Sequence, residues 1–153
     1  MLTQLTSFAP IGLKSERVTV EVGNSHGEAK FYVVGLGDTA VQESKQRVLM
    51  ALRTSKFFLP TSRVITVNLA PADIRKVGPR YDLPMALGVI LSHELVDIPE
   101  KVLAETAFIG ELALDGTLRH ISGVLSAAIA CKKYGIKRLV VPESNGAEAS
   151  LIP

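Results

Sequence analysis

The sequence lacks most features that would place a protein in a specialised class. Its one cysteine, Cys131, can form neither an internal disulfide nor a thiolate metal cage. No apolar run approaches the roughly 18 to 20 residues of a membrane span, and Met1–Pro10 has no basic start and no apolar signal core. The 17 basic and 15 acidic residues leave a net charge of +2, too even to indicate a nucleic-acid or membrane surface by itself. We therefore expect a soluble, cytoplasmic domain that has no membrane partner.

The common catalytic motifs are missing as well. The phosphate-binding pattern G-x-x-x-x-G-K-[ST] is absent, and Gly35–Gly37 lacks the third glycine of a dinucleotide fingerprint, so a tight turn is the better reading. The histidines His26, His93 and His120 are not spaced as metal ligands on one element. Cys131 lies in an alanine-rich segment, which favours a buried small hydrophobe. No cofactor or metal site is expected in this domain.

What the sequence does contain is the material for one globular domain. Its 153 residues are 47% hydrophobic and 21% charged, with no internal repeat or linker. Alternation and turn residues predict strands at Thr3–Phe8, Arg17–Val22, Lys30–Val34, Arg63–Leu69, Ala107–Leu114 and Arg138–Val141. Helical spacing predicts helices from Asp38 to about Thr54, from Asp82 through Leu91, over Val124–Tyr134, and in a last turn from Ser144 or Asn145.

Three details of these elements are specific. Asp38 is predicted to cap the first helix, Asp82 the almost wholly apolar second one, and Gly135 to end the third. The polar turn at residues 23–27 predicts that Lys30–Val34 returns as a hairpin beside Arg17–Val22. The element order predicts a single-domain α+β sandwich over residues 1–153, with helices on one face of a mixed sheet.

The most unusual segment precedes the second helix. It carries three bases just before the helix start: Arg75, Lys76 and Arg80. A helix N-terminus has free amide donors and a positive partial charge, so the segment is a candidate contact for an anion or for DNA. The alternative is structural, with Asp82 filling the free donors and Arg80 pairing with a carboxylate such as Asp73 or Glu111.

This segment and its flanks resemble a known family. The resemblance rests on Val18–Val22 (VTVEV), Val34–Gly37 (VGLG), Val41–Ser44 (VQES), Ile65–Asp73 (ITVNLAPAD), Gly78–Pro84 (GPRYDLP), Gly110–Arg119 (GELALDGTLR) and Gly123–Leu125 (GVL). Together they look like the N-terminal, ChlI-like domain of the magnesium-chelatase-like AAA+ ATPases of the ComM and YifB type. The family name does not by itself imply chelatase activity.

The family fold is similar to the proteolytic domain of Lon, in the superfamily named for the second domain of a small-subunit ribosomal protein. By motif, Arg80 occupies the position of the Lon-type serine, and Leu125 that of the lysine. A Ser–Lys dyad needs a hydroxyl nucleophile and an amine base. Arginine supplies neither at neutral pH, and leucine does not ionise. No catalytic residue is therefore expected here, and Leu125 is predicted to be buried in the core.

The resemblance also implies the function of a longer protein. An AAA+ module, expected downstream and absent from this chain, would bind ATP and magnesium and assemble as a homo-hexamer that acts on DNA. In ComM-like members this activity is branch migration during natural transformation. The present domain would be an accessory one, packing against its own AAA+ module and neighbouring protomers or contacting DNA. Two alternatives stay open: a degenerate Lon-like peptidase, and a module that senses an anion or phosphate at Gly78–Asp82.

Overall fold

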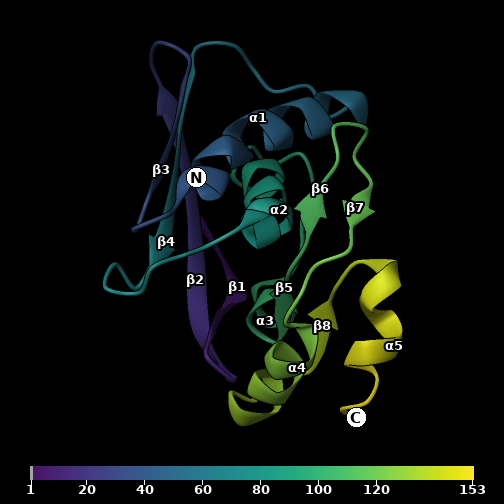
Figure 1. The fold of residues 1–153 in the computed structure, drawn as a ribbon. Coiled ribbons are helices and arrows are strands. Elements are labelled where there is room, and N and C mark those ends of the chain that lie inside the picture. Colours follow the sequence, from purple (N-terminus) through teal and green to yellow (C-terminus); the bar gives the residue numbers. More distant parts are fainter. Residues whose placement is uncertain (1) are drawn as a thin grey trace.

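A six-stranded mixed sheet forms the framework of the computed structural model, which describes residues 2–153. Its strands are β1 (Leu2–Ile11), β2 (Lys14–His26), β3 (Lys30–Val34), β4 (Arg63–Ala70), β5 (Thr106–Phe108) and β8 (Arg138–Val140). In space they follow the order β3-β4-β2-β1-β5-β8. Strands β1 and β2 form a long antiparallel hairpin at the centre, and the parallel strands β5 and β8 complete one side (Figure 1).

The expected hairpin between Arg17–Val22 and Lys30–Val34 is wrong. Strand β4 lies between β2 and β3, pairing antiparallel with β2 and parallel with β3. The reason is the connection: β3 and β4 are joined through the helix α1 (Thr39–Thr54), and a strand–helix–strand crossover brings its two strands together in parallel. The polar turn at residues 23–27 therefore leads into a third strand that does not pair with the second.

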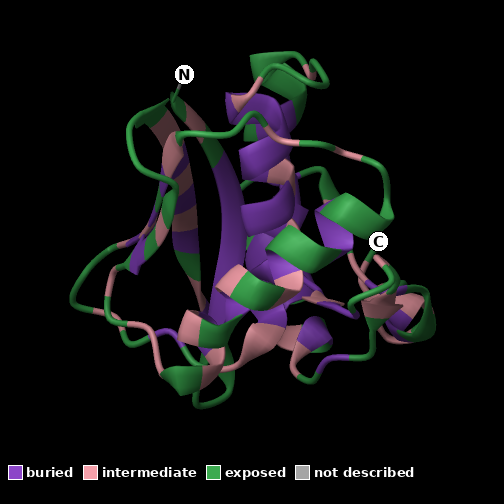
Figure 2. Ribbon diagram, turned by 90° about the horizontal axis from the view of Figure 1, so that it is seen from above, coloured by how far each residue is buried: buried purple, intermediate pink, exposed green. Residues whose placement is uncertain are grey.

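Helices α1 and α2 (Asp82–Ser92) lie side by side against the same side of the sheet (Figure 1). The inward residues of β2 and the apolar surface of α2 are buried together (Figure 2). Burial of such apolar surface contributes about 25 cal/mol per Å2. A second core cluster forms around Phe8, where β1 and β5 meet α4 (Val124–Lys133). The predicted α+β domain with a mixed sheet is confirmed.

The predicted strand Ala107–Leu114 divides in two. Strand β5 ends at Phe108, and β6 (Glu111–Leu112) pairs instead with β7 (Leu118–Arg119) in a separate hairpin. The cause is Gly110, whose N–H donates to the Arg80 carbonyl (2.9 Å) and whose carbonyl accepts from the Leu83 N–H (3.1 Å). These bonds direct the backbone toward the start of α2. The short helix α3 (Glu100–Ala104) was not predicted.

Some of the predicted helix caps and ends are confirmed, and one is wrong. Asp38 caps α1 as predicted, accepting the Val41 N–H at 2.9 Å, and Gly135 follows the end of α4 at φ +71°. Asp82 does not act as a cap. It is the first residue of α2, after the one-turn 3-10 helix η1 (Pro79–Tyr81). At the chain end, η2 (Glu143–Asn145) and α5 (Gly146–Ala149) form the expected last helical turns.

Candidate functional site

Arg80, which the motifs predict at the position of a Lon-type nucleophile, is buried and hydrogen-bonded through both its backbone and its side chain. Arg80 lies in η1, immediately before the buried helix α2, and only 7% of its surface is exposed. Its carbonyl and the Leu83 N–H are both bonded to Gly110, so the first free donor of α2 is satisfied by this chain's own backbone. The expectation that Asp82 would fill these donors is wrong, because a backbone carbonyl takes that place.

The Arg80 side chain reaches the start of α4. Its Nη2 donates to the Ser122 carbonyl at 2.9 Å. A Cβ atom placed on Gly123, which precedes α4 at φ +79°, would lie 3.8 Å from both terminal nitrogens of Arg80. Within residues 2–153 the guanidinium pairs with no carboxylate, so the expected partnership with Asp73 or Glu111 is wrong. Burial lowers the pKa of this guanidinium, because charge is disfavoured away from water.

Leu125 lies near this point but turns outward. It is the second residue of α4, 36% of its surface is exposed, and its N–H donates to Glu148 Oε2 at 3.3 Å. The prediction that Leu125 is buried is wrong: Val124 and Ala127 face the core instead. The residue types at positions 80 and 125 provide neither a hydroxyl nucleophile nor an amine base.

The three bases of the unusual segment do not form one surface. Lys76 is fully buried, and its ammonium donates to the carbonyls of Gly35 (2.6 Å) and Pro71. Burial lowers the pKa of this ammonium. Arg75 is exposed, whereas Arg80 is buried at the start of α2. Lys76 therefore joins two loops, and Arg75 is the one of the three that projects into solvent.

An ion pair between a partly buried arginine and a buried aspartate, missed by the sequence analysis, joins the helices around this position. Arg47 on α1 donates from Nε to Asp82 Oδ2 at 2.6 Å and from Nη2 to Oδ1 at 3.2 Å. The Leu112 N–H donates to the same carboxylate at 3.1 Å, and Asp82 is completely buried. No local signal in the sequence identifies a partner 35 residues away.

Tyr81 is a second feature that the sequence did not reveal. The side chain is completely buried, and its hydroxyl is one of three buried side-chain polar atoms in residues 2–153 without a hydrogen-bond partner. Burial raises its pKa to about 12, an effect that the nearby Arg80 charge reduces and Asp38 reinforces. Tyr81 therefore stays a neutral phenol, and its ring fills the core beneath η1.

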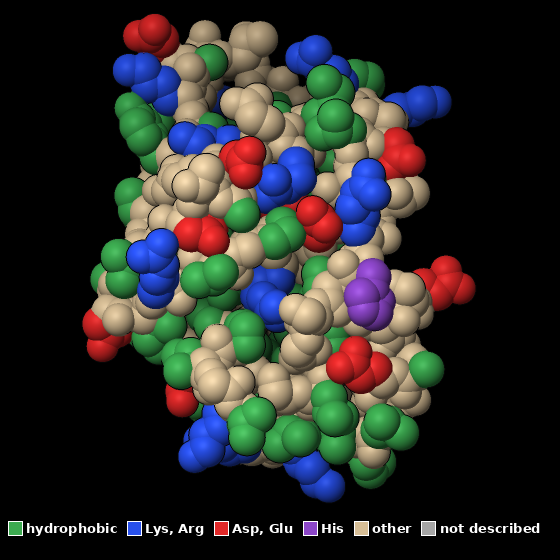
Figure 3. Space-filling view, viewed as in Figure 1, with side chains coloured by type: hydrophobic (Ala, Val, Ile, Leu, Met, Phe, Trp, Pro, Cys, Tyr) green, Lys and Arg blue, Asp and Glu red, His purple; other side chains and the backbone are tan. Residues whose placement is uncertain are grey.

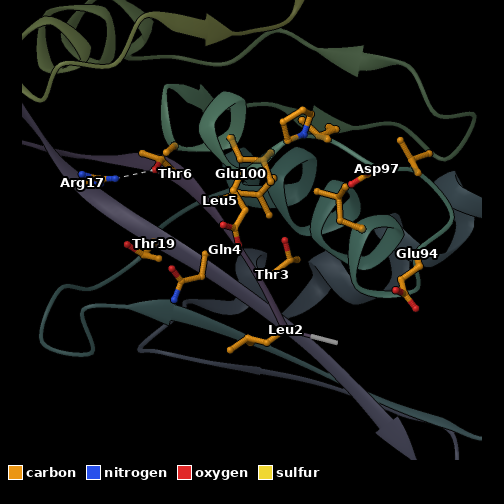
Figure 4. Close-up of a pocket in the computed structure, with 16 residues that line it drawn as sticks. Leu2, Thr3, Gln4, Leu5, Thr6, Arg17, Thr19, Glu94, Asp97 and Glu100 are labelled. Atoms are coloured by element: carbon orange, nitrogen blue, oxygen red, sulfur yellow. Dashed lines mark hydrogen bonds between the residues drawn. The ribbon is translucent and has the colours of Figure 1, made fainter.

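A cavity of about 760 Å3 lies elsewhere, along the first half of β1. Figure 4 shows Thr3, Gln4 and Leu5 on one side of it, with Glu94, Asp97 and Glu100 on the segment that runs past the strand. Its apolar lining comes mainly from five further residues: Leu91, Val96, Ile98, Pro99 and Leu103. It contains none of the predicted site residues.

The remaining candidates from the sequence stay apart from this site. His26 and His120 are exposed, and His93 lies at the end of α2 with Nδ1 2.8 Å from the Val89 carbonyl. Cys131 is buried, as expected, and burial raises its pKa to about 11. The described residues contain no group of three His, Cys, Asp or Glu side chains arranged to hold a metal ion. A search of residues 2–153 finds no helix with the length and apolar character of a membrane span.

Comparison with known proteins decides the family. The family described as "Subunit ChlI of Mg-chelatase" matches residues 20–145, most of the chain. The chain belongs to this ChlI family. Within the ChlI-type proteins it is 41% identical to competence protein ComM of Haemophilus influenzae over 95% of its length, and 39% identical to YifB of Escherichia coli over 94%. It spans 28% of the length of each of these relatives.

The similarity to Lon is weaker and also extends over most of the chain. The peroxisomal Lon protease homolog 2 of Zea mays is 33% identical over 88% of this chain, which covers 16% of that protein. The likeness between this ChlI domain and Lon, inferred above from motifs, is confirmed at the level of sequence. Arg80 and Leu125, the residues that the motifs predict at the two positions of the Lon-type dyad, are an arginine and a leucine.

Proposed function

We propose that this chain is a non-catalytic domain of a longer, cytoplasmic ComM- and YifB-like AAA+ ATPase that moves branch points in DNA. The observation that carries the proposal is the 41% identity to ComM over 95% of this chain, together with the 28% share of ComM that the chain spans. The name of that relative links it to competence. In such a protein this domain would assist the ATPase and would not catalyse a reaction itself.

Because this domain lacks a phosphate-binding motif, ATP binding is assigned to another part of the longer protein. An AAA+ module elsewhere in the longer protein would bind ATP and magnesium and form a hexamer, whereas this domain would pack against that module, a neighbouring protomer or DNA. Within the domain, Arg80 links η1 to the start of α4 through its side chain and to Gly110 through its carbonyl. A ring of six such domains would multiply weak contacts into tight binding by raising the effective concentration.

Contact of one domain with DNA would be weak. Acidic and basic side chains are interspersed over the face shown in Figure 3 and do not gather into a basic stripe. Of the three bases proposed for this contact, Arg75 is exposed and available to a phosphate, Arg80 is recessed, and Lys76 is occupied by two carbonyls. Few phosphate contacts give low affinity and a shallow dependence on salt.

The second candidate is a degenerate Lon-like peptidase, which the identity to the Zea mays Lon homologue favours. The chemistry argues against it, because Arg80 replaces the nucleophile and Leu125 the base. A serine elsewhere would need its own base. The Ser126 hydroxyl instead bonds the Ser15 hydroxyl (2.7 Å) and the Gly123 carbonyl (3.1 Å), neither of which accepts a proton at neutral pH.

The proposal is tested with the longer protein from the same gene. ATP hydrolysis is measured with no DNA, with duplex DNA and with a four-way junction, at several salt concentrations. We expect the junction to stimulate hydrolysis most, and removal of residues 1–153 to weaken that stimulation while basal hydrolysis persists. Hydrolysis that is indifferent to DNA in both proteins, or a gene that encodes no ATPase module, overturns the proposal.

A further inference from the structure

The sheet has a gap beside the first half of β1. Strand β5 is the neighbour of β1 on this side, but the two strands pair at only one position, Thr6 with Ala107. On its other edge β1 pairs with β2 along its whole length. Among the described residues, no strand therefore adjoins the β5-facing edge of Leu2–Leu5, and no hydrogen bond from another segment reaches the backbone there.

An open strand edge is a template for another strand. Backbone N–H and C=O groups alternate between the two edges, so two of the four residues Leu2–Leu5 direct their donors and acceptors into the gap. A cavity of about 760 Å3 lies along this edge, between Leu2–Leu5 and the segment from Glu94 to Ala104 (Figure 4). Such a segment would pair with β1 and lie between it and α3, the helix that directly precedes β5 and contacts β1.

The walls of the groove determine the chemistry of its occupant. Apolar side chains line its inner wall, from Leu5 on β1 to Leu91 on α2 and Leu103 on α3. The rim carries three exposed carboxylates, on Glu94, Asp97 and Glu100 (Figure 4). The lining includes a single base, Arg17, whose Nη2 donates to the Thr6 hydroxyl at 3.2 Å.

We propose that this groove binds an extended, basic polypeptide segment by strand addition to Leu2–Leu5. Alternate apolar side chains of the segment pack on the inner wall, and its lysines or arginines face Glu94, Asp97 and Glu100. The backbone bonds supply affinity, and the acidic rim selects the charge. The site is independent of the Arg80 region and of the proposed action on DNA, so either proposal can fail without the other.

The probe is a seven-residue peptide of alternating lysine and valine, titrated into the 15N-labelled chain. Two matched peptides serve as controls, one with glutamate in place of lysine and one with proline in place of the central valines. We expect saturable amide shifts confined to residues 2–6 and 94–104, and slowed hydrogen exchange at two alternate amides of Leu2–Leu5. Both control peptides should bind at least about tenfold more weakly, because one reverses the charge and the other removes backbone donors.

A charge-reversed variant tests the rim. Asp97 and Glu100 are both exposed, so D97K/E100K should fold normally and bind the basic peptide at least about tenfold more weakly. The control E43K changes an exposed acid on α1 and should bind like the unmodified chain. Equal binding of the three peptides, shifts centred elsewhere, no binding of the basic peptide, or self-association of the chain through Leu2–Leu5 would each overturn the proposal.

Discussion

Arg47 and Asp82 join two helices that are far apart in the sequence. The guanidinium of Arg47 on α1 donates to both carboxylate oxygens of Asp82 on α2, from Nε to Oδ2 at 2.6 Å and from Nη2 to Oδ1 at 3.2 Å. The carboxylate is completely buried, whereas one fifth of the Arg47 side chain is exposed. Removing Arg47 therefore leaves a buried carboxylate, whereas removing Asp82 leaves a partly exposed guanidinium.

Loss of Arg47 should be the more harmful change. Arg47→Ala leaves a buried carboxylate with the Leu112 N–H as its remaining partner, and should lower the free energy of unfolding by about 3 kcal/mol. Asp82→Ala leaves an arginine that can turn to solvent, at a cost of about 1 to 2 kcal/mol. Urea denaturation measures both values, with Arg53→Ala as the exposed control. Equal losses would contradict the expected difference between the two partners, and a double variant whose loss equals the sum of the two would show that the pair is not coupled.

Position 125 should tolerate the lysine that a Lon-type site carries. Because Leu125 is exposed, Leu125→Lys should cost no more than about 1 kcal/mol, mainly from a positive charge at a helix N-terminus. Val124→Lys, one residue away, buries an unpaired ammonium and should cost more than about 3 kcal/mol. Thermal unfolding of the two variants decides; a Leu125→Lys variant as unstable as Val124→Lys would mean that the leucine packs in the core.

Gly35 should be irreplaceable. Its φ is +112°, and an added Cβ would collide with the backbone of Leu69. Gly35→Ala should therefore lower the free energy of unfolding by at least about 2 kcal/mol, because backbone cannot move aside as a flexible side chain can. The control is Gly146→Ala, where φ is −61° and the space is open. That change should leave stability unchanged or raise it by about 0.5 kcal/mol. A Gly35→Ala protein as stable as the Gly146→Ala protein would contradict the geometry.

The Cys131 thiol should make the free energy of unfolding decrease as the pH rises above 9. Burial raises its pKa from 9.0 to about 11, so between these values the unfolded chain loses a proton that the folded chain keeps. This contribution to stability is complete below pH 9 and declines as pH rises toward 11, by up to about 1.4 kcal/mol per pH unit. Urea unfolding of the protein and of Cys131→Ala across pH 8 to 10.5 measures this contribution as the difference between the two free energies of unfolding. Parallel curves for the two proteins would show that the thiol ionises equally in both states.

Local patterns in the sequence predicted those elements that local forces determine. The alternation of β2, the Asp38 cap and the end of α4 at Gly135 depend on residues close together in the chain, and all three are confirmed. The partner of β3 depends on a crossover, and the division of Ala107–Leu114 on Gly110 bonding to Arg80 and Leu83. Neither leaves a periodic signal.

For the candidate site the sequence offered positions by motif similarity but did not reveal the surroundings of the side chains. Motif similarity placed Arg80 and Leu125 at the two Lon-type positions, but charge counting did not show that Lys76 is buried or that Arg80 bonds a carbonyl. Burial of a charged side chain is a property of the whole fold. The groove along Leu2–Leu5 was invisible for a related reason, since it arises where β5 begins later than its neighbour.

One measurement tests the central claim, that this domain serves a DNA motor and is not a peptidase. The longer protein is incubated with ATP, a labelled four-way junction and fluorescent casein in one reaction. The account predicts ATP-dependent movement of the branch point, impaired when residues 1–153 are removed, with casein intact throughout. Casein cleavage that tracks the purified protein, while the junction stays in place, would contradict it.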